Sequence, residues 1–423
     1  MKYKGMGYLR RKLASRKERC ETRYDYYEMK NQMVDISSVI PPEFRWLKEC
    51  LGWCSKAVDS IADRISFVEF SNDNFNMQEI YDKNNPDVLF DSAIISSLIT
   101  SCSFIYISQK VGEMPRLQVI DGRHATGIID PITNMLVEGY AILEEDVLGN
   151  PIIEAYFIQG VTYFYERGEK PYKIKNKAPY PLLVPIINRP DAKRPFGHSV
   201  ISRACISIQQ AAMRTLKRSE VSAEFYSFPQ KYVLGLEPGA EMDKWKATIS
   251  SLMQISKDED GDKPTVGQFA QQSMAPYVEQ LKMLASLFAG ETGLTLDDLG
   301  FSTENPSSVE AIKAQHENLR LKAKKAQKTF ATGFINAGFL AACLRDGYTY
   351  SRDQIYLTKI KWAPIFEPDA SALSVIGDGA IKINQAVPGY FDKDNLKELT
   401  GIDYSASSST SNIDDMFREE IDE

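Results

Sequence analysis

Two adjacent carboxylates, Asp297 and Asp298, precede a long basic stretch of the chain. Carboxylates can hold a divalent metal ion that activates water, which is the chemistry of metal-dependent hydrolases and nucleases. One interpretation is therefore a hydrolase or nuclease with dispersed carboxylates around this pair, and metal-dependent cleavage of DNA by the purified protein would favour it.

The local motifs of the common enzyme classes are absent or incomplete. No Gly-Lys dipeptide occurs, which excludes the phosphate-binding loop of the GxxxxGK[ST] type, so we expect no ATP hydrolysis. Gly5-Met6-Gly7 lacks the third glycine and the preceding strand of a dinucleotide fingerprint. His316-Glu317 has no second histidine one turn later, and no GxSxG elbow supports a serine hydrolase, although Ser, His and Asp could still meet in space. We expect no catalytic residues, no metal and no cofactor.

An acidic run at Asp258, Glu259 and Asp260 imitates the beginning of a calcium loop. Lys263 stands where that loop requires glycine, and Phe269 stands where the closing glutamate is required. We interpret the run as an exposed turn.

Composition limits the possible partners. With 423 residues, 43% of them hydrophobic, the chain can bury a sizeable core and form two or more compact regions. Its formal net charge of −7 argues against a protein whose whole surface coats nucleic acid. Any contact with DNA must be local and weak. The basic residues near the start of the chain are more simply a solvated helix face than a nucleic-acid patch.

The cysteines and the hydropathy indicate a protein made in a reducing cytosol. The six cysteines form no CxxC pair, and no histidine lies near Cys50 and Cys54, so we expect packed thiols and no zinc site. No apolar run approaches the length that spans a bilayer, and residues 1–19 lack the features of a signal peptide. We expect neither secretion nor membrane insertion.

The elements alternate between helical and β-rich regions, which predicts an α+β fold. Periodicity predicts helices at 8–29, 44–64, 89–103, 199–228 and 274–292. Short aromatic and β-branched runs separated by turn signals predict strands at 104–108, 117–120, 137–143, 152–158 and 162–165. An antiparallel meander is the simplest arrangement of these strands, because no helices intervene.

The second half contains three further features. Between the helices that end at 228 and begin at 274, we expect a strand at 231–236, a helix at 241–256 and a strand at 265–269. Residues 354–362 suggest a strand, and 370–399 suggest short helices broken by Gly377, Gly379 and Pro388-Gly389. From Ser405 the chain is serine-rich and then acidic, which predicts a disordered tail.

The segment 294–330 is the most informative part of the sequence. A polar loop, Gly300 to Ser308, leads into a helix that either Asn305 or Ser307 caps, the latter in a capping box with Glu310. No proline interrupts 309–345, so a single long helix is expected there. Alone, it would be a surface helix with a charged side.

Several segments resemble the portal proteins of tailed bacteriophages, especially those of siphophages. The most specific is 305–313, Asn-Pro-Ser-Ser-Val-Glu-Ala-Ile-Lys, followed by Glu317-Asn318-Leu319, which resembles the region after the portal tunnel loop. Tyr24-Asp25-Tyr26-Tyr27, the run 53–64 and the Pro-Phe-Gly-His-Ser entry at 195–199 also resemble portals.

The resemblance implies a ring subunit with named parts. These are a wing at 1–198 with a β-rich part at 104–187, a first stem helix at 199–228, an α/β clip at 229–273 and a second stem helix at 274–293. They continue with a tunnel loop at 294–308, a long wing helix at 309–345, returning wing strands at 346–368, a small helical crown at 369–402 and a disordered acidic tail at 403–423. The chain is short for this family, mainly in the crown.

What the resemblance implies about function is a non-enzymatic ring, typically a dodecamer, at one vertex of the capsid. It would nucleate procapsid assembly with scaffolding protein and the major capsid protein, and dock the terminase large subunit. Double-stranded DNA would pass through it during packaging and ejection, and a head-tail adaptor would then join. Such a protein is found in the virion, and in the host cytoplasm during assembly. A monomeric helical adaptor is a further alternative.

Two sets of residues are expected to make contacts in that ring. Ser302, Thr303, Asn305 and Ser307 would line the narrowest point of the DNA channel, helped by the positive end of the helix that begins there. Lys313 and Arg320 would contribute next. Asp258, Glu259 and Asp260 would form the terminase-facing surface of the clip.

Overall fold

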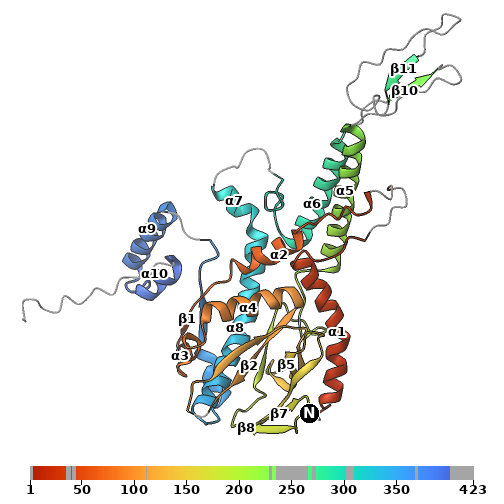
Figure 1. Ribbon diagram of the computed structural model, residues 1–423. Helices are drawn as coiled ribbons and strands as arrows, with labels where there is room; N and C mark the ends of the chain where they lie inside the picture. The colour runs from red at the N-terminus through yellow and green to blue at the C-terminus, as the bar shows by residue number, and fades with distance from the viewer. Residues whose placement is uncertain are drawn as a thin grey trace, which may run out of the picture.

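The computed structural model describes residues 3–34, 40, 44–110, 112–227, 231–234, 265–268, 273–301, 309–366 and 370–400. Within them, helices combine with antiparallel sheets, which confirms the α+β class (Figure 1). The expected clip helix at 241–256 and the acidic tail lie outside the described residues.

The largest sheet is a five-stranded antiparallel meander. Its order is β4-β5-β6-β7-β8, with β4 Ala125–Ile129, β5 Leu136–Glu145, β6 Pro151–Ile158, β7 Val161–Glu166 and β8 Tyr172–Lys175. Four neighbouring pairs joined by short turns make this the meander that the turn signals predicted. β4 was not predicted from the sequence. It contains Gly127, where an added Cβ atom would lie 2.7 Å from the carbonyl oxygen of Glu138.

Two further expected strands belong to a different sheet. β2 (Cys102–Ser108) lies between β3 (Arg116–Ile120) and β9 (Leu183–Ile187). All five residues of β9 are buried, so the strand lacks the alternation that marks a half-exposed strand. For the same reason, periodicity did not predict it.

Helix α1 (Met6–Tyr27) packs on the five-stranded sheet. Leu9 and Leu13 form a small core with Tyr140 and Ile142 of β5. The backbone nitrogens just before the helix, at Lys4 and Gly5, donate to the carboxylate of Glu138, which is 0% exposed. A buried carboxylate thus accepts bonds from the start of the helix, where negative charge is favoured.

The centre of the molecule is built around α8 (Glu317–Arg345). It packs on β9, on α2 (Trp53–Ala62) and on α3 (Met77–Asp82). The ring of Phe334 stacks on Phe90 of α4 (Pro86–Thr100), with centroids 4.0 Å apart. α4 is buried along most of its length, which agrees with its high proportion of apolar residues.

One small sheet joins distant parts of the chain. β1 (Phe67–Ser71) pairs with β12 (Lys359–Trp362) in antiparallel register. β12 thus confirms the second half of the strand expected at 354–362. The strand predicted for residues 354–357 is wrong, because Arg352–Leu357 forms a 3₁₀ helix. The hydroxyl of Ser351 caps the start of that helix.

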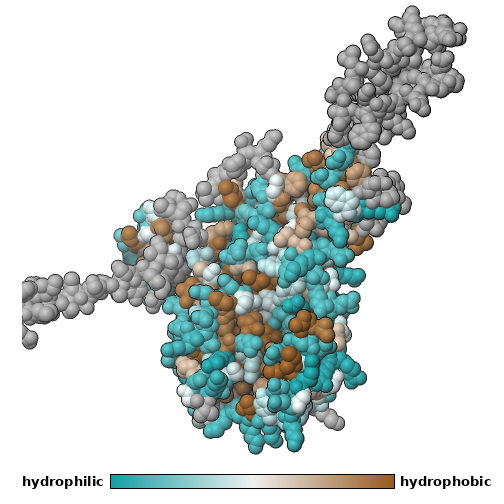
Figure 2. Space-filling view, in the orientation of Figure 1, coloured by the Kyte–Doolittle hydropathy of each residue, from teal (hydrophilic) through white to brown (hydrophobic). Residues whose placement is uncertain are grey.

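Helices α5 (Arg203–Ser227) and α6 (Ala275–Thr292) lie side by side and form a stalk (Figure 1). A two-stranded sheet of β10 (Lys231–Leu234) and β11 (Thr265–Gln268) stands at the far end of the stalk. Hydrophobic side chains remain on the stalk surface (Figure 2), and those of α6 include Val278, Met283 and Leu287.

The helix expected at 44–64 is shorter than predicted, because only Trp53–Ala62 is α-helical. The buried side chain of Gln209 accepts from the backbone nitrogen of Cys54 at 2.9 Å and donates to the carbonyl of Leu51. These tertiary hydrogen bonds replace helical ones, and Trp46 is 73% exposed and outside the core. The helix expected at 199–228 likewise begins only at Arg203, because the hydroxyl of Ser199 bonds the backbone of Ile99 and Ile201.

Two more expectations about helices are wrong. The helix expected at 309–345 is interrupted at His316, so α7 (Val309–Gln315) precedes α8. Conversely, α9 (Ala370–Ala386) continues through Gly377 and Gly379, because single glycines cost a helix only about 1 kcal/mol each. A shorter helix, α10 (Lys393–Thr400), follows, and together with α9 it stands apart from the central body (Figure 1).

Candidate functional site

Most of the sequence-predicted contact residues lie outside the described residues. This holds for Ser302, Thr303, Asn305 and Ser307 of the loop, and for the acidic residues Asp258, Glu259 and Asp260. Lys313 and Arg320 are described, on α7 and α8 respectively. The segments that enter and leave the loop are described as well, and they define where it is attached.

The loop leaves α6 through two glycines with positive φ. Gly293 ends α6 at φ 82°, and Gly300 follows a short 3₁₀ turn, Asp297–Leu299, at φ 87°. Glycine adopts this conformation without steric cost. Between them, the carboxylate of Asp298 accepts bonds from the backbone nitrogen of Thr295 at 2.9 Å and from its hydroxyl at 3.0 Å.

The far root of the loop lies close to the same carboxylate. Nδ1 of His316, at the break between α7 and α8, is 3.6 Å from Oδ2 of Asp298. That is longer than a hydrogen bond, and both side chains are largely buried. The two ends of the loop therefore lie close together at Asp298 and His316. Asp298 has a structural role here, through its bonds to Thr295. The sequence alone had left open that it belongs to a metal site.

Arg320 is already neutralised within its own helix. Its Nε and Nη2 atoms each lie 2.7 Å from a different carboxylate oxygen of Glu317, in a bidentate pair one turn apart. The hydrogen bond lowers the pKa of Glu317 and raises the pKa of Arg320. A phosphate would have to compete with Glu317 for this guanidinium.

The dipole assigned to the helix start is also smaller than expected. α7 has seven residues and ends before His316, whereas the sequence predicted an unbroken helix to 345. Macrodipole effects come from aligned peptides in a continuous helix. The positive end of α7 is thus that of a helix of about two turns.

A lysine that sequence reasoning missed joins three helices below the loop. Nζ of Lys322 on α8 donates to the carbonyls of Glu291 and Thr292 at the end of α6, at 3.0 and 2.6 Å. A carboxylate oxygen of Glu291 in turn accepts from the hydroxyl of Ser202, just before α5, at 2.9 Å. Burial is the main cause that lowers the pKa of Lys322. No signal in the sequence suggests this contact, because Lys322 lies near the start of its own helix and thirty residues from Thr292.

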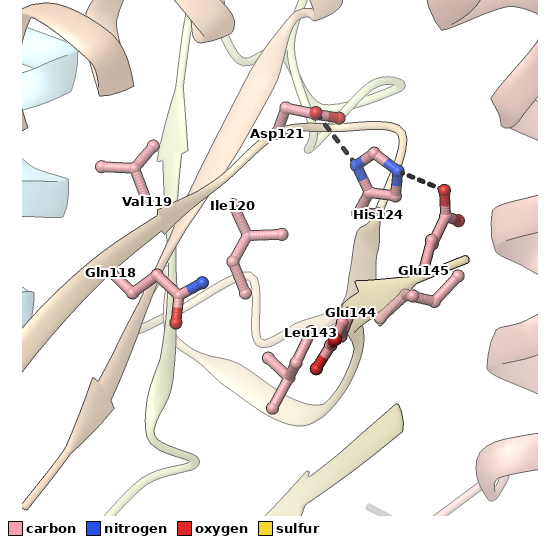
Figure 3. Close-up of a pocket in the computed structure, with 9 residues that line it drawn as sticks. Gln118, Val119, Ile120, Asp121, His124, Leu143, Glu144 and Glu145 are labelled. Carbon is pink, nitrogen blue, oxygen red and sulfur yellow. Dashed lines mark hydrogen bonds and ion pairs between the residues drawn. The ribbon is translucent and has the colours of Figure 1, made fainter. Parts of the chain in front are cut away.

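A second cluster that the sequence did not predict lines a pocket of about 300 Å³ beside β5 (Figure 3). His124 lies between two carboxylates: Nδ1 is 3.0 Å from Asp121 and Nε2 is 3.1 Å from Glu145. Burial would raise the pKa of Asp121, but hydrogen bonds from His124 and Arg123 outweigh it and lower the pKa to about 2. The bond with Asp121 is the main cause that raises the pKa of His124.

This cluster does not have the arrangement of a hydrolytic site. Both nitrogens of His124 are occupied by carboxylates, and the residues that line the pocket include no serine, threonine or cysteine that could act as a nucleophile. Lys17 of α1 also pairs with Glu145 at 3.1 Å, so the cluster fastens α1 to the sheet. Within the described residues there is no group of three or more His, Cys, Asp or Glu side chains that could hold a metal ion.

Among the described residues, no helix combines the length and the apolar character needed to cross a bilayer.

The sequence matches the family described as "Phage portal protein, SPP1 Gp6-like" over residues 7–371. Two curated relatives are both named "Portal protein". That of Mycobacterium phage D29 is 24% identical over 398 residues, which cover 89% of this chain and 81% of the relative. That of Mycobacterium phage L5 is 23% identical over 380 residues, covering 85% and 77%.

Solved structures show a more distant similarity. A chain in the neck of a native gene transfer agent (GTA) particle, computed with C12 symmetry, is 13% identical with a TM-score of 0.44, and the alignment covers 83% of this chain and 89% of that one. A chain in the virion of the native GTA particle is 12% identical with a TM-score of 0.43, covering 83% and 89%.

Proposed function

Because this chain belongs to the phage portal proteins of the SPP1 Gp6-like family, we propose that its copies form a ring, typically a dodecamer, at one vertex of a phage capsid. The ring is the channel through which double-stranded DNA is packaged and ejected. It nucleates procapsid assembly with scaffolding protein and the major capsid protein, and later joins a head-tail adaptor. The protein is then a component of the virion, and of the host cytoplasm during assembly, with no catalytic role.

The match to the family over 7–371 is the observation that carries this proposal. It spans the stalk, both roots of the loop and the whole of α8. In the portal interpretation, α5 and α6 are the stem and β10 with β11 belongs to the clip. The segment 294–308 is the tunnel loop, 1–198 together with α7, α8 and the returning segment 346–368 is the wing, and 369–402 is the crown.

Weak binding of DNA is what a channel requires. Each phosphate that a protein neutralises adds affinity through counterion release, and a ring multiplies every contact by its symmetry. Small polar groups at Ser302, Thr303, Asn305 and Ser307 would line the narrowest point without holding the strand. The pairing of Arg320 with Glu317 supports the same view, because a phosphate has to compete with Glu317 for that guanidinium. Lys313 remains the second candidate for a phosphate contact.

The ring is tested by negative-stain electron microscopy of the purified protein, with mass measured on the same sample. Rings with a central hole are the expected result, and they fix the symmetry. A strict monomer at high concentration, even with scaffolding protein present, would contradict the proposal and favour the adaptor interpretation.

The channel is tested by adding charge to the loop. Ser302→Lys should slow or stall DNA packaging by rings that assemble normally, because it adds one phosphate contact for every subunit. Ser92→Lys makes the same change at an exposed position of α4 and is the control. Equal packaging by the wild type and both variants would remove the loop from the channel.

The clip is proposed as the docking site of the terminase large subunit, through Asp258, Glu259 and Asp260. Reversing these charges to lysine should weaken terminase binding and leave the ring intact. Glu169→Lys, in the turn between β7 and β8, is the matched reversal elsewhere on the surface. Terminase affinity that is unchanged by the clip variants would contradict this assignment.

A further inference from the structure

Four basic residues of α1 form two pairs with different surroundings. On one side of the helix, each cation has an acidic partner: Arg10 pairs with Glu154, and Lys17 pairs with Glu145. On the other side, Arg19 and Arg23 face the start of α5, where Arg203 stands. Among the described residues, none of these three guanidiniums forms an ion pair with a carboxylate.

These three arginines line a pocket of about 300 Å³ between α1 and the start of α5. Arg19 and Arg203 are exposed, and Arg23 is partly buried beneath them. The only hydrogen bond of Arg23 to a described residue runs from Nη1 to the carbonyl oxygen of Thr100, at 3.3 Å. The remaining donors of Arg23 are available to a ligand.

The charge in this pocket is uncompensated. The pocket contains one carboxylate, Glu18, against three guanidiniums. Burial is the main cause that lowers the pKa of Arg23 to about 10, and the neighbouring charges of Arg19 and Arg16 lower it further. Arg16 does not line the pocket, but it is 9% exposed and its Nη1 atom has no hydrogen-bond partner among the described residues. An anion in the pocket would relieve this repulsion.

The hydroxyls in the pocket do not supply the missing counter-charge. Ser15 donates to the carbonyl of Lys12 at 2.8 Å, and Thr22 donates to the carbonyl of Glu18 at 3.0 Å. Recognition therefore falls to the guanidiniums, whose planar pairs of N–H groups fit phosphate oxygens better than they fit a single-atom anion. The positive end of α5, a helix of 25 residues, adds to the same field.

We propose that the pocket between α1 and α5 binds a phosphate-type oxyanion through Arg19, Arg23 and Arg203. The source is either free phosphate or the phosphodiester of a nucleic acid backbone. The site lies on α1 and not on the loop between α6 and α7, so it goes beyond the channel function and can fail without affecting it.

Calorimetric titration of the intact, assembled protein with inorganic phosphate tests the site. Arg19→Gln and Arg203→Gln should each weaken phosphate binding by about tenfold, because each removes a charged hydrogen-bond donor. Both residues are exposed, so neither change should disturb folding. Arg11→Gln, at an exposed position of α1 that does not line the pocket, removes the same charge and should leave the affinity within about twofold. Glu18→Gln should tighten binding.

A second arm replaces phosphate with a short DNA duplex. If backbone phosphate is the natural ligand, Arg19→Gln and Arg203→Gln weaken duplex binding and lower its salt dependence by about one unit of slope each. If free phosphate is the ligand, only the first arm responds. The proposal is overturned if, in both arms, the pocket variants behave like Arg11→Gln.

Discussion

Nζ of Lys322 lies 2.6 Å from the carbonyl oxygen of Thr292, the last residue of α6. The two residues are thirty positions apart, on either side of the loop. The lysine thus supplies a donor to a helix end whose carbonyls have no partner within the helix. It also fixes α6 against α8.

Lys322→Met should lower the free energy of unfolding by about 1–2 kcal/mol, because the carbonyls of α6 lose a charged donor while the aliphatic packing is retained. Urea unfolding followed by circular dichroism measures the change. Lys325→Met is the matched control, since Lys325 is exposed on the same helix, and should stay within about 0.5 kcal/mol of wild type. Equal effects of the two variants would contradict the capping role.

The raised pKa of His124 predicts how the free energy of unfolding depends on pH. Its pKa in the folded state is raised above the ordinary value of 6.5, mainly by Asp121. The stabilisation is therefore fully present below about 6.5 and is lost as the pH rises through the folded-state value, at about 1.4 kcal/mol for each unit of pKa shift. In His124→Gln, the free energy of unfolding should depend less steeply on pH across this range. An unchanged slope would exclude His124 as the source of the pH dependence.

Asp121 acts in the opposite direction. Its pKa is lowered to about 2, so its stabilisation is present above the ordinary value of 3.8 and is lost as the pH falls towards 2. Asp121→Asn should therefore reduce stability at neutral pH and make acid unfolding less steep. Acid titration of the wild type and this variant, followed by tryptophan fluorescence, distinguishes the two curves, and parallel curves would contradict the assignment.

Two glycines should respond oppositely to alanine. A Cβ atom on Gly333 of α8 would lie 2.6 Å from Cδ1 of Ile186 and 3.0 Å from the carbonyl oxygen of Pro185, so Gly333→Ala should destabilise by about 1–3 kcal/mol. Gly290 of α6 has no neighbour within 4 Å, so Gly290→Ala should stabilise by up to about 1 kcal/mol. Thermal unfolding gives both signs, and a stabilising Gly333→Ala would show that α8 is not tightly packed on β9.

The pairing of Glu317 with Arg320 leads to a prediction about DNA. Glu317→Gln should strengthen the salt-dependent binding of duplex DNA and slow its passage, because it frees one guanidinium in every subunit. Duplex affinity at two salt concentrations measures this, with Glu169→Gln as the control for net charge. An effect no larger than that of the control would mean that Arg320 lies away from the DNA.

Local patterns were sufficient to predict much of the fold. The aromatic and β-branched runs of β5 to β7 and the intervening turns predicted a meander, because strand propensity and turn residues are properties of short stretches of sequence. The apolar stripe of α5 predicted a helix for the same reason, and α1 and α6 were predicted as helices as well. The glycine-rich exit from α6 predicted a loop before 309, where α7 begins.

The tertiary structure decided those features that depend on contacts between residues far apart in the chain. Gln209 stops α2 from extending back to Phe44 by bonding residues 51 and 54, and His316 interrupts a run that no proline breaks. The cluster of Asp121, His124 and Glu145, and the arginine pocket between α1 and α5, exist only because separate elements meet. Hydrogen bonds and interactions between charges depend on distances in space, and hydrophobic periodicity along the sequence carries no information about those distances.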